Sequence, residues 1–227
     1  SHYLKDYLGG YAVLNLSGGL PPVVPTLIAG VGLSNKIPKQ FIPVGQGFFV
    51  YGKNGGGGTV NFNNGQRAFQ KETAAVSTTL FKTKNDSKST TATPKNDNDT
   101  VPIDTFKRVR LGLNTASGYH RQLLLAFMED KATDGFDFGY DGMIMDNFPA
   151  DMYFLQGTNP LVIQGVGRFD TTASYPLGIK TDREGPVTFQ LDGKENFENQ
   201  QMMFIHDLSN NTYHNIQNGS FTVNLPL

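Results

Sequence analysis

The sequence predicts an all-β protein made of two tandem or packed antiparallel β-sandwich modules, of the Ig-like or jelly-roll-like kind. Short apolar and aromatic segments recur between turn residues at the spacing expected for a sandwich. The chain of 227 residues contains 26 Gly, 12 Pro and 17 Phe, which favours many turns and aromatic-filled sheets. Apolar residues at helical spacing are scarce, which disfavours interleaved helices and a parallel α/β sheet.

A polar stretch divides the chain. Residues 82–100, KTKNDSKSTTATPKNDNDT, hold no large apolar side chain and cannot bury enough surface to offset their ordering entropy. We therefore expect a β-sandwich module over 1–81, a polar linker or loop over 82–102, and a second β-sandwich module over 103–227.

The first module is expected to hold a β-hairpin. Residues 48–51 (FFVY) form one predicted strand, and residues 59–62 (TVNF) alternate as the return strand. Gly55 to Gly58 supply the turn between them. These glycines do not form a phosphate-binding loop, because no Lys-Ser/Thr pair follows and no helix begins after them.

The second module is expected to hold seven strands, separated by turn sequences such as TASG, QGTNP and TDREGP. In the first of them Val109, Leu111 and Leu113 alternate with Arg108 and Arg110, so the arginines are predicted to face solvent. The predicted strands cover residues 106–113, 122–128, 152–155, 161–166, 186–191, 202–206 and 220–225.

Composition excludes several function classes. The chain has no cysteine, which rules out disulfides, thiolate metal sites and cysteine nucleophiles. A formal net charge of −1 argues against nucleic-acid binding, which needs a concentrated basic surface. No apolar run approaches the roughly 18 residues of a membrane span, and we expect neither a span nor a signal peptide in this sequence.

The segment DGFDFGYDG, residues 134–142, offers the clearest candidate site. Asp134, Asp137 and Asp141 supply the hard oxygen ligands that calcium prefers, although their spacing does not match an EF-hand loop. The interpretation that the residues favour is a wide structural turn, with positive φ at its three glycines and its three aromatic residues anchored in the core. A catalytic carboxylate pair is a third reading, but nothing in the sequence selects one pair. No catalytic residue and no certain cofactor is predicted; calcium at these aspartates is the candidate.

Histidines and aromatics give weaker signals. His206 and His214 flank a predicted hairpin and could face each other across it, as a surface pair rather than a metal site. Six aromatics, if exposed, could form a sugar-stacking platform, although aromatics more often fill the core of a sandwich. They are Phe48, Phe49, Tyr51, Tyr153, Phe154 and Phe189.

Several longer motifs carry a resemblance to a known group of proteins. The segments GGYAVLNLSGG, IPVGQGFFV, GTVNFNNGQRAF, RVRLGLNTASGYHRQLLLAFMEDKATDGFDFGYDG and IHDLSNNTYHNIQNGSFTVNLP occur in this order. The chain resembles the C-terminal β-rich region of secreted Bacteroidota proteins, of flavobacterial type, just upstream of the sorting domain for the type IX secretion system. The resemblance implies a first module that is incomplete at its N-terminus, partnership with the type IX machinery, and an extracellular or outer cell-surface location.

The sequence thus predicts a non-catalytic structural or adhesive region of an exported protein. One alternative is a carbohydrate-binding module that accompanies a polysaccharide-degrading enzyme and binds an extracellular glycan. Another is a cargo or plug subunit of an outer-membrane secretion complex. Other surface proteins are further candidate partners.

Overall fold

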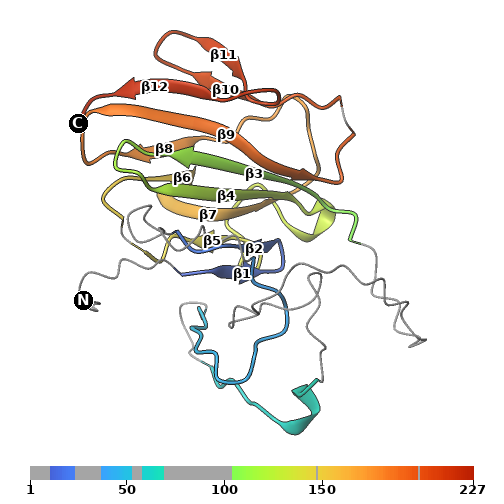
Figure 1. Ribbon diagram of the computed structural model, residues 1–227. Helices are drawn as coiled ribbons and strands as arrows, with labels where there is room; N and C mark the ends of the chain where they lie inside the picture. Colours follow the sequence, from blue (N-terminus) through green and yellow to red (C-terminus); the bar gives the residue numbers. More distant parts are fainter. Residues whose placement is uncertain (1–10, 24–36, 53–57, 69–103, 147, 199) are drawn as a thin grey trace, which may run out of the picture. The chain divides into compact units, whose positions relative to one another are not determined.

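The computed structural model describes residues 11–23, 37–52, 58–68, 104–146, 148–198 and 200–227 (Figure 1). The chain divides into two compact units. One combines residues 1–38 with 106–227, and the other covers 39–105. The strands that the structure describes all lie in the first unit.

The first unit is built on one large sheet, which confirms the all-β prediction. Its strands lie in the order β12-β9-β3-β4-β7-β6-β8, and β5 also pairs with β7. All pairs are antiparallel except β4 with β7, which run parallel. The strands are β3 (Lys107–Asn114), β4 (His120–Phe127), β5 (Gly142–Met143), β6 (Asp151–Gln156), β7 (Asn159–Val166), β8 (Leu177–Lys180), β9 (Gly185–Glu195) and β12 (Phe221–Leu225).

Local sequence explains the two tight connections in this sheet. The turn between β3 and β4 places Gly118 at φ 82°, and the turn between β6 and β7 places Gly157 at φ 63°. Glycine adopts these positive φ values without the steric cost that a Cβ atom brings. Secondary structure outside the strands is limited, in the described residues, to two short 3₁₀ turns, η3 (Asn64–Gln66) and η4 (Glu129–Lys131). None of the described segments forms a helix with the length and apolarity that a membrane span requires.

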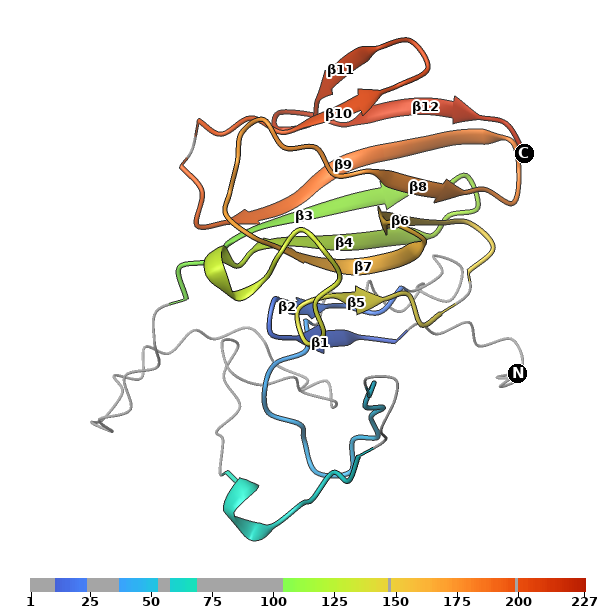
Figure 2. The same cartoon turned by 180° about the vertical axis from the view of Figure 1, so that it is seen from behind.

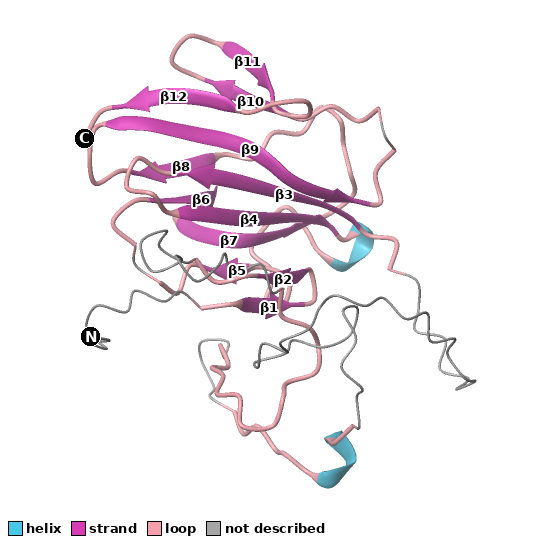
Figure 3. Cartoon of the chain, in the orientation of Figure 1, coloured by secondary structure: helices cyan, strands magenta, loops and turns pink. Residues whose placement is uncertain are grey.

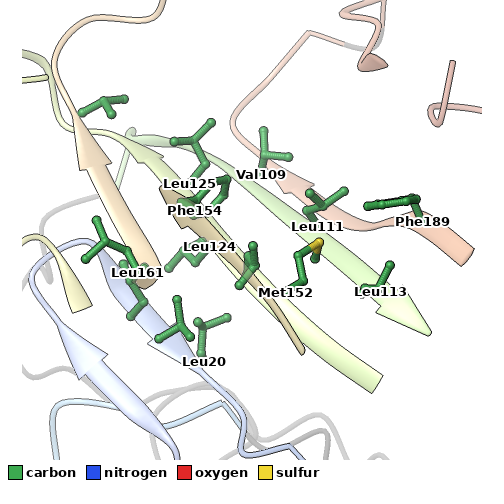
Figure 4. Packing of buried hydrophobic residues seen from close by; sticks show 14 of the residues in the cluster. Leu20, Val109, Leu111, Leu113, Leu124, Leu125, Met152, Phe154, Leu161 and Phe189 are labelled. Atoms are coloured by element: carbon green, nitrogen blue, oxygen red, sulfur yellow. The ribbon is translucent and has the colours of Figure 1, made fainter. Parts of the chain in front are cut away.

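The sheet curls so that β6 and β8 overlap β3 and β4 in both views (Figures 1 and 2), and β6 contacts β4 directly. This curled, β-sandwich-like arrangement encloses an apolar core. Leu113 and Leu123 are fully buried, as is Met152 of β6. Figure 4 shows leucine side chains from β3 and β4 pointing toward Met152 and Phe154. Alternate residues of each strand fill this space, because successive side chains in a strand point to opposite faces.

The opposite face of β3 and β4 is covered by a small hairpin of β1 (Val13–Asn15) and β2 (Gly18–Leu20). Leu20 is buried close to Leu124 and Leu161 (Figure 4). A Cβ atom added at Gly18 would lie only 3.0 Å from Leu124 Cδ2. The hairpin backbone therefore packs tightly on the sheet.

This hairpin overturns the prediction that Arg108 and Arg110 face solvent, because their side chains lie beneath it. The two residues are only 6% and 9% exposed. Arg108 Nε donates to the carbonyl oxygen of Ser17 at 2.5 Å, and Arg110 Nη1 donates to that of Gly19 at 2.9 Å. Glu195 of β9 forms ion pairs with both guanidinium groups. Buried charges are tolerated when they are paired and hydrogen-bonded in this way.

The predicted linker over 82–102 lies outside the described residues. The boundaries expected for the two modules therefore stay predictions. The β1–β2 hairpin, at the start of the expected module over 1–81, belongs to the same compact unit as residues 106–227. Segments about ninety residues apart in the sequence thus share one core.

In the second unit, residues 48–51 and 59–62 form no strands, so the predicted hairpin is wrong. Of its predicted turn, Gly55 to Gly57 lie outside the described residues. Phe49 is 82% exposed, and Phe48 and Phe62 meet edge to face with ring centroids 6.1 Å apart. A two-stranded hairpin is marginal in water without a surface to pack on. The described aromatic residues of this unit are largely exposed.

A second small hairpin, β10 (Phe204–Asp207) and β11 (Thr212–Asn215), lies beside β12 (Figure 3). It confirms the hairpin predicted between His206 and His214. The two histidines do not face each other, because His206 lies opposite Tyr213 and His214 lies opposite Ile205. Successive residues in a strand point to opposite faces, so this offset of one residue separates the two imidazoles.

Candidate functional site

Asp141 holds the acidic loop against the sheet. Its Oδ1 accepts a hydrogen bond from Gly165 N of β7 at 2.8 Å, and its Oδ2 accepts one from Asp137 N at 2.6 Å. Burial raises the pKa of this carboxyl, and the hydrogen bonds from these two backbone amides oppose the rise. Asp141, only 8% exposed, therefore links the acidic loop to β7 through its two hydrogen bonds.

Asp137 stabilises the turn between residues 133 and 137. Its Oδ2 accepts from Thr133 N at 2.6 Å and from Thr133 Oγ1 at 2.8 Å. Aspartate side chains commonly stabilise turns through local backbone amides in this way.

The loop glycines and aromatics follow the structural-turn reading only in part. Gly139 adopts φ 88°, but neither Gly135 nor Gly142 has a positive φ, so that prediction holds for one glycine of three. Phe136 and Tyr140 pack against buried residues, as predicted, whereas Phe138 is 43% exposed. The loop is anchored by two of its three rings.

Asp134 differs from the other two aspartates because it lines an open hollow of about 740 Å³. The hollow lies between the start of the acidic loop and residues 167–175. No side chain at Gly167 fills it, and a Cβ atom there would lie 3.8 Å from Asp134 Oδ1. The other polar and aromatic lining residues are Thr133, Arg168, Phe169, Asp170, Thr171 and Tyr175.

Two carboxylates influence the tyrosine in this hollow. Burial, and then the negative charges of Asp134 and Asp170, raise the pKa of Tyr175 to about 12. Tyr175 is therefore a neutral phenol at physiological pH, able to donate a hydrogen bond. Hydrogen bonds from Thr172 N and Oγ1 lower the pKa of Asp170, which stays ionised. The hollow combines the carboxylates of Asp134 and Asp170 with the donor groups of Tyr175 and Arg168, and so suits a hydroxylated ligand.

The three aspartates do not converge on one point. Asp137 and Asp141 direct carboxylate oxygens to backbone amides, and Asp134 faces the hollow. Across the described ranges of the chain, no group of three or more histidine, aspartate or glutamate side chains is placed to hold a metal ion. Calcium binding by Asp134, Asp137 and Asp141 stays a prediction, and a titration that tests it is given in the Discussion.

Sequence reasoning missed a polar network centred on Asp192 of β9. The Asp192 carboxylate accepts hydrogen bonds from His120 Nε2 at 2.9 Å, Gln122 Nε2 at 2.8 Å and Gln190 Nε2 at 2.7 Å. The other imidazole nitrogen, His120 Nδ1, lies 2.8 Å from Asn114 Oδ1. Burial favours a higher pKa for Asp192, but the three hydrogen bonds outweigh it and hold the pKa below its usual value.

A glycine makes room for this network. A Cβ atom at Gly112 of β3 would lie 2.5 Å from Asp192 Oδ1, so the carboxylate occupies the space of the missing side chain. The alternation of His120 and Gln122 on one face of β4 is the sequence signal that could have revealed the polar surface. The partner on β9 could not be found in this way, because the β3–β9 register shifts next to Arg110.

The six aromatics proposed as a sugar platform do not form one group. Phe154 and Phe189 are core residues, each 3% exposed, in agreement with the core reading. Phe48, Phe49 and Tyr51 belong to the other unit and are exposed. Tyr153 alone is partly exposed on the large sheet.

Comparison with known proteins gives one match. The family model described as "Domain of unknown function (DUF8693)" matches residues 9–225, nearly the whole chain. No curated protein and no solved structure matches the chain significantly.

Proposed function

This chain belongs to the DUF8693 family, a domain of unknown function, and we propose that it serves as a non-catalytic structural and adhesive region of an exported protein. Its work in this proposal is to hold a stable β-sandwich-like surface outside the cell. The type IX secretion machinery is the proposed partner during export.

The observation that supports the proposal is the packing of both faces of the sheet and the hydrogen bonds that hold the β1–β2 hairpin on it. Its curled interior is packed with the chain's own leucine, methionine and phenylalanine side chains. On the opposite face, two buried arginines bind the β1–β2 hairpin through its backbone carbonyl groups. Such a unit resists local opening, because exposing either face would uncover apolar surface or an unpaired charge.

A stable scaffold of this kind suits a protein that leaves the protection of the cytosol. The chain reaches it without disulfides, since it has no cysteine. The resemblance of its motif order to that of secreted Bacteroidota proteins is a further reason to propose export and a cell-surface or extracellular location.

Surface labelling tests the export proposal. The full-length protein would be tagged in its native bacterium, and intact cells would be probed with an antibody to the tag. We expect labelling of intact cells that disappears when type IX secretion is inactivated. A tag that reaches antibody only after lysis, in cells with working type IX secretion, would overturn the proposal.

A separate assay tests the non-catalytic role. The purified chain would be incubated with polysaccharides and with casein, and released reducing ends and free amines would be measured. We expect no release above the level of buffer. Hydrolysis that Asp134→Asn abolishes, while Asp130→Asn leaves it intact, would establish an enzyme in place of a structural region.

A further inference from the structure

A second, smaller hollow lies on the outer side of β6, away from the acidic loop. It encloses about 250 Å³ and is lined by residues of β6 and β8 and by Ile144, Asp146, Phe148, Thr158 and Pro160. Sites for drug-sized ligands usually measure about 300–1,000 Å³, so this groove suits one ring-sized group. Its lining includes Ile144, Asp146, Tyr153, Leu155, Pro160 and Lys180.

We propose that this groove binds one neutral sugar ring of a glycan, stacked on the ring of Tyr153. The inference goes beyond the structural role proposed above and does not depend on it. It would supply a defined contact for the adhesive activity.

Tyr153, which lines the groove, is paired with Gly178. The two residues lie directly opposite each other on the antiparallel strands β6 and β8. A Cβ atom at Gly178 would lie 2.2 Å from Tyr153 Cε2 and 2.7 Å from Cζ. The phenol ring therefore occupies the space that a side chain at residue 178 would fill, and Tyr153 also lines the groove.

Apolar walls flank this ring. Leu155 is 36% exposed, and together with Ile144 and Pro160 it borders the space above Tyr153. None of the described aromatic rings stacks on Tyr153, in contrast to Tyr175, which meets Phe127 edge to face. A ligand with a flat apolar face can therefore take the place beside Tyr153 that a protein ring takes elsewhere.

Polar atoms lie at the rim of the same groove. The Asp146 side chain is 9% exposed, and its Oδ1 accepts from Arg121 Nη2 at 2.7 Å. Within the described residues no donor bonds to Asp146 Oδ2 or to the Tyr153 hydroxyl. Lys180 Nζ donates to the carbonyl oxygen of Phe148 at 3.1 Å and adds an ammonium group to the rim. Acceptor and donor groups thus line the same groove as Tyr153.

Charge selects among the ligands that could stack here. Asp146 and Asp151 are balanced by Arg121 and Lys180, so these four groups carry no net formal charge. A phosphate or an amine would leave an unbalanced charge in the groove. A pyranose ring combines an apolar C–H face for Tyr153 with hydroxyl groups for the carboxylate and ammonium at the rim, and it is uncharged.

A purely structural reading of Tyr153 is that it covers Gly178 and so stabilises the edge of the sheet. The two readings differ in whether Tyr153 also contacts a ligand. In the structural reading, replacing Tyr153 changes stability alone. In the binding reading, ligand affinity falls even under conditions where the variant is fully folded.

Titration by two-dimensional NMR tests the proposal on the isotope-labelled full chain. The probes would be cellohexaose, xylohexaose and mannohexaose, with hexagalacturonic acid and a deca-proline peptide as comparisons. We expect at least one neutral hexasaccharide to shift amide signals of residues 144–160 and 177–180. Tyr153→Ala should weaken that binding about tenfold or more, and Tyr153→Phe should weaken it less because the ring remains.

Two further variants serve as a second test of the groove and as a control. Leu155→Arg places a long side chain at the groove rim and should block binding even if Tyr153→Ala fails to fold. Tyr213→Ala removes another exposed tyrosine, on β11, and should leave binding unchanged. The proposal is wrong if no neutral hexasaccharide shifts these signals at about 10 mM. It is also wrong if Leu155→Arg binds as well as the parent chain, or if only the acidic sugar or the peptide binds.

Discussion

Replacing Asp151 with alanine should destabilise the protein far more than replacing any exposed carboxylate. Asp151 is 3% exposed and lies beside Arg121, which is 4% exposed. Asp151 Oδ1 accepts from Arg121 Nε at 2.5 Å, and Oδ2 accepts from Arg121 Nη2 at 2.6 Å. Burial favours a lower pKa for Arg121, yet its bonds and attraction to Asp151 and Asp146 raise it, so pairing outweighs desolvation.

The size of the effect follows from what remains after the change. Breaking a buried ion pair from one side costs about 3–5 kcal/mol, because the other charge stays buried without its partner. Here Asp146 Oδ1 still accepts from Arg121 Nη2, so we expect the lower end, about 3 kcal/mol. With a urea dependence of about 2 kcal/mol per molar, the midpoint should fall by about 1.5 M.

Urea unfolding followed by far-UV circular dichroism provides the assay. Asp130→Ala is the matched control, because its pair with Arg168 has side chains 80% and 77% exposed and should contribute under about 1 kcal/mol. The triple variant Arg121→Leu/Asp146→Leu/Asp151→Leu should be more stable than Asp151→Ala, because none of these three buried charges is left without its partner. Equal midpoints for Asp151→Ala and Asp130→Ala would refute the reasoning.

Three other substitutions and a calcium titration probe the hairpin, the Asp192 network and the acidic loop. Arg110→Met removes the hydrogen bond to the Gly19 carbonyl oxygen and the ion pair with Glu195. Amide hydrogens of the β1–β2 hairpin should then exchange at least about tenfold faster, while those of β4 change less. Equal acceleration everywhere would contradict the claim that Arg110 holds the hairpin on the sheet. Gly112→Ala should cost about 1–3 kcal/mol in thermal unfolding, because the new methyl group meets the Asp192 carboxylate; an unchanged melting temperature would count against the network. The pKa of Asp192 is lowered in the folded protein, so its carboxylate contributes stability that is present above the usual aspartate pKa. This stability is lost as pH falls through the pKa of Asp192 in the folded protein. In Asp192→Asn the free energy of unfolding should therefore depend less on pH between about pH 5 and 2. A calcium titration is expected to leave the melting temperature unchanged, since Asp137 and Asp141 already accept backbone hydrogen bonds; a rise of several degrees, lost in Asp134→Asn, would establish the predicted calcium site.

The large sheet could be predicted because its signal is local. Alternating residues in 107–114 and 120–127, and the turns TASG and QGTN, indicate strands without knowledge of the partners. The predicted strands over 106–113 and 122–128 fall within two residues of those observed. Strands β1, β2, β5 and β8 were not predicted, because each has only two to four residues and is too short to show an alternation.

Features that depend on distant contacts could not be predicted. Arg108 looked exposed from its alternation with Val109, but its partner Ser17 is 91 positions away in the sequence. The run FFVY at 48–51 has strand-like residues, yet a strand also needs a neighbour, and the sequence does not say which segment supplies it.

In the candidate site, too, local contacts could be predicted from the sequence and distant contacts could not. The hydrogen bonds of Asp137 with Thr133 span four residues and match the turn chemistry expected of DGFDFGYDG. The overlap of Tyr153 with Gly178, and the placement of Asp134 beside Tyr175, are set by pairing between strands and loops far apart in the chain. Only the structure brings those groups together.

The central claim is that the β1–β2 hairpin and the strands of residues 106–227 fold as one unit, fastened by buried arginines. Native-state hydrogen exchange at increasing urea tests this claim most directly. We predict that the protected amides of β2, β3, β4 and β9 converge on a single free energy of opening, equal to that of global unfolding. The claim would be contradicted if the β2 amides exchanged freely in native buffer while those of β3 and β4 stayed protected.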